Sequence, residues 1–236
     1  MKLATIFTLT ALIGGGSLAL GLLAMNPTQA ERMDPLAMNH GGMMGGMDHS
    51  GMDKGEMMDD MDHSDMGHAM DLGPADANYD LRFIDGMIPH HEGAVVMAQE
   101  ALEKSQRPEI LELAEAIIAA QADEIAQMAN WRADWYADAS PQLQMWDAGM
   151  GHMMRMSAEM EANMRMDVSL GEADDDFDLR FIEAMIPHHE GAIVMAEDAL
   201  DKSERPEILE LAQAILASQQ AEIEQMESWK QEWYGQ

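Results

Sequence analysis

The chain has 236 residues, with 27 methionines, no cysteine and a formal net charge of −31. So many negative charges repel nucleic acid and anionic lipid and concentrate cations, which argues against a nucleic-acid partner. The same charge would also simply keep an exported protein soluble and monomeric.

The first 30 residues predict an export signal. Lys2 precedes an apolar run over residues 3–25, and residues 28–30 suit a cleavage site. Because such a run is also long enough to span a bilayer, an uncleaved N-terminal anchor is the alternative. In both cases we expect a periplasmic or extracellular protein that contacts the membrane only through this segment. The absence of cysteine fits an oxidising compartment, where a thiol would pair or oxidise.

Residues 31–75 are rich in Met, Asp, Gly and His and contain no aromatic or β-branched residue. Such a composition cannot build a core, so we predict a disordered segment. Its thioethers and imidazoles recur every few residues, and these ligands suit soft or borderline metals such as copper. We interpret the segment as a copper collector, with a low-complexity tail as the alternative. Its candidate ligands are His40, Met43, Met44, Met47, His49, His63, Met66 and His68.

Residues 79–136 and 177–234 repeat one another, and most of their differences are conservative. Each repeat predicts two helices joined by a short turn, with Pro108 at the first position of the second helix of repeat one. Over residues 110–135, spacings of three and four place most apolar side chains on one helix face. Because one hairpin cannot bury both of its faces alone, the two hairpins together predict a four-helix bundle.

The connector, residues 137–176, is long enough to cross the whole length of a helix. Such a crossover would set the third helix parallel to the second, as in ferritin-like bundles. Residues 149–166 also show methionines at helical spacing and are predicted to form a helix, in which His152 and Met153 are further candidate ligands. The predicted fold class of residues 76–236 is thus all-α: a ferritin-like four-helix bundle of two tandem hairpins with a long Met-rich crossover.

The segment MIPHHEG occurs twice, at residues 87–93 and 185–191. Each copy places two adjacent histidines behind a methionine, a combination that suits reduced copper. The helix should kink or begin at Pro89, because proline lacks the N–H of an internal hydrogen bond. If the helix begins there, the positive end of its dipole favours neutral, ligating imidazoles.

The second helix of each hairpin adds polar residues to this layer. With the turn near residue 106, His91 lies level with Gln121, and Glu124 and Met128 follow. Each hairpin is therefore expected to hold its own layer of His, His, Met, Gln and Glu. The resulting candidate ligands are Met87, His90, His91, Met97, Glu124 and Met128 in the first repeat, and Met185, His188, His189, Met195, Glu222 and Met226 in the second.

Other interpretations of these residues exist. A histidine on an apolar face is usually a hydrogen-bonded core residue, and methionine at helical spacing usually fills a core. A di-iron or di-manganese oxidase or storage protein requires Glu-x-x-His, whereas this chain has Met-x-x-His, although Glu124 and Glu222 keep that alternative open. A thiolate copper centre needs cysteine, and a purely structural or adhesive protein leaves the polar layer unexplained. We therefore expect no enzymatic activity.

The segments RFIDGMIPHHEGAVVMA and QADEIAQM, repeated as RFIEAMIPHHEGAIVMA and QQAEIEQM, resemble domain-of-unknown-function family 305, and in particular its CopM-like periplasmic copper-binding members. The resemblance covers about residues 76–236, and the matching motif positions are the twelve ligands named above. It implies a ferritin-like bundle, binding of copper(I) and copper(II), and a role in copper tolerance. We therefore expect an exported protein that sequesters or delivers copper, with silver as a further candidate ion and another copper-handling protein as a candidate partner.

Overall fold

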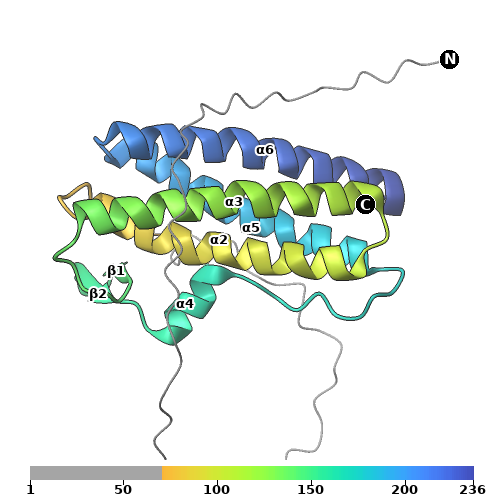
Figure 1. Ribbon diagram of the computed structural model, residues 1–236, viewed down its shortest axis with the longest axis horizontal. Helices are drawn as coiled ribbons and strands as arrows, with labels where there is room; N and C mark the ends of the chain where they lie inside the picture. Colours follow the sequence, from red (N-terminus) through yellow and green to blue (C-terminus); the bar gives the residue numbers. More distant parts are fainter. Residues whose placement is uncertain (1–70) are drawn as a thin grey trace, which may run out of the picture. The chain divides into compact units, whose positions relative to one another are not determined.

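Four long helices build most of the computed structural model, which describes residues 71–236. The first hairpin consists of α2 (Tyr79–Lys104) and α3 (Pro108–Trp135), and the second of α5 (Phe177–Lys202) and α6 (Pro206–Tyr234) (Figure 1). Both hairpins were predicted from the repeats, and they confirm a mostly helical fold. The predicted export signal and almost all of the Met/His-rich segment lie outside the described residues.

Serine and proline fix the turn between the helices of each hairpin. Pro108 and Pro206 occupy the first turns of α3 and α6, where a missing N–H costs nothing. Ser105 Oγ accepts a hydrogen bond from the Arg107 N–H (3.1 Å) and donates one to Asp178 Oδ1 at the start of α5 (2.6 Å). Ser203 repeats these bonds with residues 205 and 80. Each turn therefore binds the first turn of the other hairpin.

The two hairpins pack through α2 and α5, which run antiparallel. At one end, the Tyr79 hydroxyl at the start of α2 donates a hydrogen bond to Asp198 Oδ2 near the end of α5 (2.8 Å). At the other end, Ser105, which follows α2, donates to Asp178 at the start of α5. Since α3 is antiparallel to α2, α5 runs parallel to α3. This is the direction that the predicted crossover requires.

The connector contains a short β-ribbon followed by a short helix. Strands β1 (Gln144–Asp147) and β2 (His152–Arg155) pair antiparallel, and α4 (Ala158–Arg165) follows. The prediction of one helix over residues 149–166 is therefore wrong in its first half. Gly149 and Gly151 lie in the turn of the ribbon, and Gly151 takes a φ of +69° that favours glycine. The helix starts only after Ser157, whose Oγ accepts the Met160 N–H (3.2 Å).

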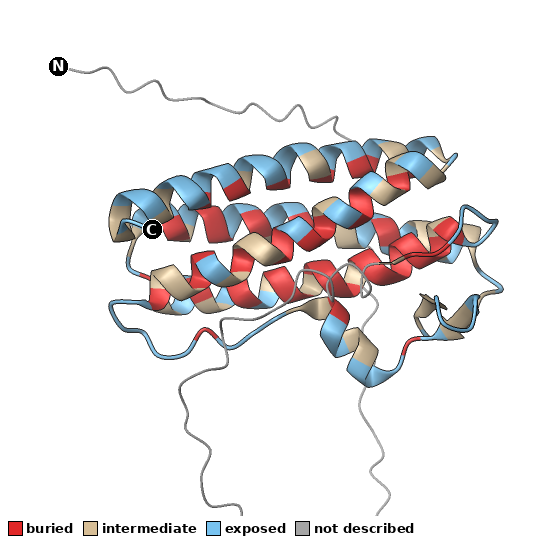
Figure 2. Cartoon of the chain, turned by 180° about the vertical axis from the view of Figure 1, so that it is seen from behind, coloured by how far each residue is buried: buried red, intermediate tan, exposed pale blue. Residues whose placement is uncertain are grey.

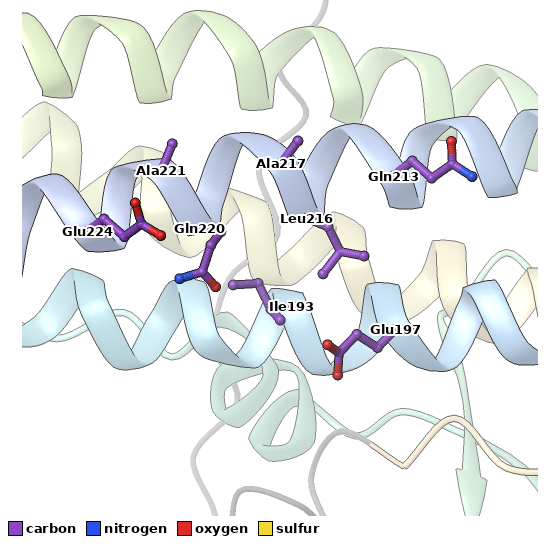
Figure 3. A pocket seen from close by; sticks show the side chains of 8 residues that line it. All are labelled: Ile193, Glu197, Gln213, Leu216, Ala217, Gln220, Ala221 and Glu224. Atoms are coloured by element: carbon purple, nitrogen blue, oxygen red, sulfur yellow. The ribbon is translucent and has the colours of Figure 1, made fainter.

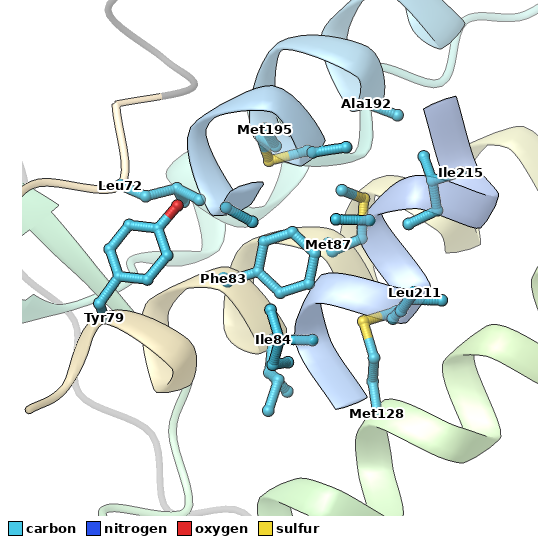
Figure 4. Packing of buried hydrophobic residues seen from close by; sticks show 14 of the residues in the cluster. Leu72, Tyr79, Phe83, Ile84, Met87, Met128, Ala192, Met195, Leu211 and Ile215 are labelled. Carbon is cyan, nitrogen blue, oxygen red and sulfur yellow. The ribbon is translucent and has the colours of Figure 1, made fainter. Parts of the chain in front are cut away.

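Buried side chains line the inner faces of the four long helices (Figure 2). They form two apolar clusters. The first contains Met87, Met128 and Met195 from α2, α3 and α5 (Figure 4). The second contains Met97, Met185 and Met226 from α2, α5 and α6. None of the helices in residues 71–236 combines the length and apolar character needed to span a bilayer.

Candidate metal site

The two MIPHHEG segments meet at the centre of the bundle. The ring centroids of His90 and His188 lie 4.0 Å apart, and His91 and His189 follow on the outer sides at 6.4 and 6.3 Å. All four residues are at most 1% exposed. The histidines therefore form one row, His91–His90–His188–His189, to which both hairpins contribute. We call this the histidine row.

The histidine row lies inside its helices rather than at their ends. Pro89 and Pro187 are internal to α2 and α5, so of the two expected alternatives a helix start at Pro89 is wrong, and the dipole argument that depended on it does not apply. Burial also favours the neutral form of the imidazoles. It lowers the pKa of His188 from 6.5 to about 3 and lowers the pKa of His90 well below 6.5, and charge on neighbouring imidazoles adds to both shifts. Both central imidazoles are thus neutral at ordinary pH.

Carboxylates orient the two outer imidazoles. His91 Nε2 lies 2.7 Å from Glu124 Oε2, and His189 Nε2 lies 2.6 Å from Glu222 Oε2. Because an ionised carboxylate only accepts, Nε2 carries the proton and Nδ1 keeps a lone pair. Metal-binding histidines commonly use their second nitrogen in this way. The geometry thus places Glu124 and Glu222 behind the imidazoles.

Of the two central imidazoles, only that of His188 has a hydrogen-bond partner in the described residues. His188 Nε2 lies 3.0 Å from the carbonyl oxygen of Arg165, which also leaves Nδ1 as the free lone pair. Neither nitrogen of His90 has a hydrogen-bond partner among residues 71–236, and the same holds for Nδ1 of the other three histidines. Gln121 and Gln219 each leave Oε1 unpartnered within these residues. A buried polar group left in this state costs about 1–3 kcal/mol, so such a concentration of them points to a ligand.

The methionines that flank the histidine row form groups to which both repeats contribute. Met87 shares its cluster with Met195 of the second repeat, and Met97 shares its cluster with Met185. Because α2 and α5 are antiparallel, residues that follow His90 lie level with residues that precede His188. Thioethers consequently lie on both sides of the histidine row, and each side contains methionines from both repeats.

The family model for "Domain of unknown function (DUF305)" matches residues 80–230. The chain belongs to the DUF305 family. It is similar to the solved structures of CopM in its Cu(II)-bound form (39% identity, TM-score 0.52), its Ag-bound form obtained by soaking (35%, 0.52) and its Cu(I)-bound form (36%, 0.50). Each comparison covers 66% of this chain and 97% of the CopM chain. We found no curated protein that matches the sequence.

Other predicted ligands of this DUF305 chain lie away from the histidine row. His152 and Met153 belong to β2, where His152 is exposed and its Nδ1 lies 2.9 Å from its neighbour's carbonyl oxygen. The eight candidates between His40 and His68 lie outside the described residues. Within residues 71–236, no group of three or more histidine, cysteine, aspartate or glutamate side chains is placed to hold a metal ion by itself.

A groove on the surface of the bundle does not belong to this site. It lies between α5 and α6 and is lined by side chains such as Glu197, Gln213 and Glu224, without histidine or methionine (Figure 3). What the sequence did not predict is the carbonyl oxygen of Arg165 beside His188. A backbone group carries no side-chain pattern, so only the path of the connector could reveal it.

Proposed function

We propose that this protein binds copper at the histidine row and sequesters or delivers it, without catalysis of its own. The observation that carries the proposal is the set of buried imidazole nitrogens that lack partners in the described chain and lie between two groups of thioethers. Neutral imidazole and thioether suit copper(I) and, by the same softness, silver(I). The similarity to CopM, which has been solved with Cu(I), Cu(II) and Ag, supports the same ions.

The donor set favours copper over iron or manganese. Ferritin-like di-metal sites take a Glu-x-x-His pair from each of two helices and a further Glu from each of the others. Here the positions three residues before His90 and His188 are Met87 and Met185. The nearby carboxylates are hydrogen-bonded to the outer histidines, where they raise the basicity of the imidazoles. The crossover topology is ferritin-like, but the site chemistry is that of a soft ion.

The two copper oxidation states would use different donors. Copper(I) would take Nδ1 of the imidazoles together with thioethers from Met87, Met97, Met128 and their counterparts Met185, Met195 and Met226. Copper(II) prefers nitrogen and oxygen donors, so Glu124 and Glu222 would join the imidazoles for that ion.

The location and the Met/His-rich segment complete the proposal. We infer that the protein is exported to the periplasm or the cell exterior, where residues 31–75 collect copper for the bundle. The net charge of −31 raises the local concentration of cations. The bound copper would be stored for resistance or handed to another copper-handling protein.

A copper(I) competition titration of the full-length protein tests the site. Replacing His90 and His188 with alanine should remove the tightest class of sites, while weaker binding by residues 31–75 persists. The matched control is His152→Ala, an exposed histidine of β2, which should leave the tight sites intact. X-ray absorption of the loaded protein should show nitrogen together with sulfur donors. Tight binding that survives in the double variant would refute the histidine row as the site.

A further inference from the structure

The connector covers only one side of the histidine row. The end of α4 lies on α2, where the carbonyl oxygen of Arg165 is so close to Gly93 that a Cβ there would lie 1.8 Å from it. The Arg165 guanidinium also forms an ion pair with Glu92 (Nη1–Oε2 2.6 Å). Together with the hydrogen bond to His188, these contacts place the C-terminal end of α4 directly over the central imidazoles.

The methionines of this segment lead from the surface to the core. Met164 is buried in the first apolar cluster, and its Cε lies 3.7 Å from the position of a Cβ on Gly86. Met195 Sδ approaches the same position at 3.7 Å. Met160 and Met166 are partly buried and pack against that cluster. A series of methionine side chains therefore leads from the partly exposed surface of α4 to the buried methionines beside the histidine row.

The contacts that hold α4 are those of an element that can open. The helix has only eight residues, and the ion pair of Arg165 with Glu92 is partly exposed. At its end Met166 takes a φ of +51°, a left-handed conformation that is unfavourable for a residue with a side chain. Opening would release this conformation and withdraw the Arg165 carbonyl from His188.

We propose that Met160, Met164 and Met166 form a transient binding site for a soft monovalent cation, through which copper(I) reaches the histidine row when α4 moves away from α2. The proposal rests on the proposed function. A site whose ligands are at most 1% exposed needs a path for its ion, and each thioether along this path can take the ion from the one before. Methionine loses no proton on binding, so the passage does not require proton release.

The alternative is that these methionines only fill space, as methionine commonly does. Methionine-to-leucine substitution separates the two roles, because it nearly conserves volume and apolar character while removing the sulfur. The triple variant M160L/M164L/M166L has a control in M150L/M154L, two methionines of the β-ribbon and its turn that do not pack against the first apolar cluster. The single variants Met160→Leu and Met166→Leu, at partly buried positions, guard against a folding defect in the triple variant.

The experiment follows silver(I) in the full-length protein. With less than one equivalent of silver(I), NMR exchange spectroscopy of the imidazole rings measures how fast the metal enters and leaves the histidine row, and a parallel competition titration measures affinity. The triple variant should exchange about tenfold more slowly or worse, which corresponds to about 1.4 kcal/mol of barrier, with unchanged affinity. The control variant should match the wild type.

Two results would overturn the proposal. Unchanged exchange in the triple variant would show that the thioethers only fill space, and a parallel loss of affinity would show that they are ligands of the final site rather than of a passage. If silver(I) leaves the ring signals of wild-type His90 and His188 unaltered, the proposed function itself is wrong. The experiment thus distinguishes failure of the access route from failure of the proposed function.

Discussion

His90 and His188 lie in contact at the centre of the bundle, with ring centroids 4.0 Å apart and ring planes tilted by 54°, although they are 98 positions apart in the sequence. Neither hairpin can form this contact by itself, since α2 supplies one ring and α5 the other. The histidine row is therefore as much a product of hairpin packing as of the MIPHHEG motif. Changes that shift α2 against α5 should affect binding even when every ligand is present.

Removing the charge of the two outer carboxylates should weaken copper binding without removing it. Glu124→Gln and Glu222→Gln keep a hydrogen-bonding oxygen beside His91 and His189 but no longer raise the basicity of the imidazoles. Loss of such a carboxylate costs about 10- to 100-fold in metal affinity. A copper(I) competition titration of each variant measures the loss. Affinity equal to that of the wild type would show that the carboxylates are only structural.

The copper-free protein should lose stability as the pH falls from about 6.5 toward 3. Burial lowers the pKa of His188 to about 3, whereas the unfolded imidazole binds its proton near 6.5. The unfolded state thus takes up more protons in this window, and each pH unit costs about 1.4 kcal/mol per such histidine. His90 acts in the same direction.

The substitution His188→Leu isolates this contribution. It should flatten the fall of the unfolding free energy between pH 6 and pH 4, measured from urea midpoints of copper-free protein. The control His152→Leu, at an exposed position, should keep the wild-type slope. If the slope of the His188 variant equals that of the wild type, burial of that imidazole is not its cause.

Adding one methyl group at position 93 should displace α4. A Cβ on Gly93 would lie 1.8 Å from the Arg165 carbonyl oxygen, and backbone cannot yield as a side chain can. We expect Gly93→Ala to destabilise the protein by about 1–3 kcal/mol and to raise amide exchange over residues 158–166. Gly86→Ala on the same helix is the control, because its nearest neighbours are side chains at 3.4 Å or more. Equal protection of α4 in both variants would contradict the contact.

The buried carboxylate of Asp85 should matter much more than its counterpart in the second repeat. Asp85 accepts from the Arg132 Nε–H (2.5 Å) and from the N–H of Gln144 (2.8 Å), and burial raises its pKa despite these bonds. Asp85→Ala should cost about 3–5 kcal/mol, because it leaves a largely buried arginine without its partner.

The equivalent pair in the second repeat provides the comparison. Glu183 pairs with Lys230 at 2.9 Å, and its side chain is 44% exposed. Because exposed ion pairs contribute only about 0–1 kcal/mol, Glu183→Ala should change the unfolding free energy little. Thermal or urea unfolding of both variants measures the difference. Similar costs for the two substitutions would contradict the larger contribution expected of the buried Asp85 carboxylate.

Much of this fold could be predicted from the sequence because its signals are local. Pro108 marks the start of α3, and the repeat of that helix pair predicts a second hairpin. The length of the connector predicts the crossover. The contact of His90 with His188 could not be predicted. Helical periodicity shows which residues share one face of a helix, but it does not show which other helix packs against that face. The same reason explains why the packing of Met97 with Met185 of the other repeat could not be predicted.

The β-ribbon and the Arg165 carbonyl were missed for different reasons. In residues 149–166 the methionine spacing suited a helix, and the glycines at the start of this stretch overrode it. The carbonyl belongs to a residue with no special side-chain signal. The carboxylates were predicted as ligands, and the hydrogen bonds of Glu124 and Glu222 to the outer histidines add an orienting role in the copper-free structure.

The antiparallel packing of α2 on α5 gives the two hairpins the relationship of subunits in a twofold dimer. Each turn binds the first turn of the other hairpin, and each methionine group contains residues of both hairpins, so these contacts occur in equivalent pairs. In a true homodimer both halves would be identical by symmetry. A single chain removes that constraint: α4 packs mainly on α2 of the first hairpin, and of the two central histidines His188 has a hydrogen-bond partner in the described chain whereas His90 has none. Two similar hairpins in one chain are thus free to become unequal halves of one site.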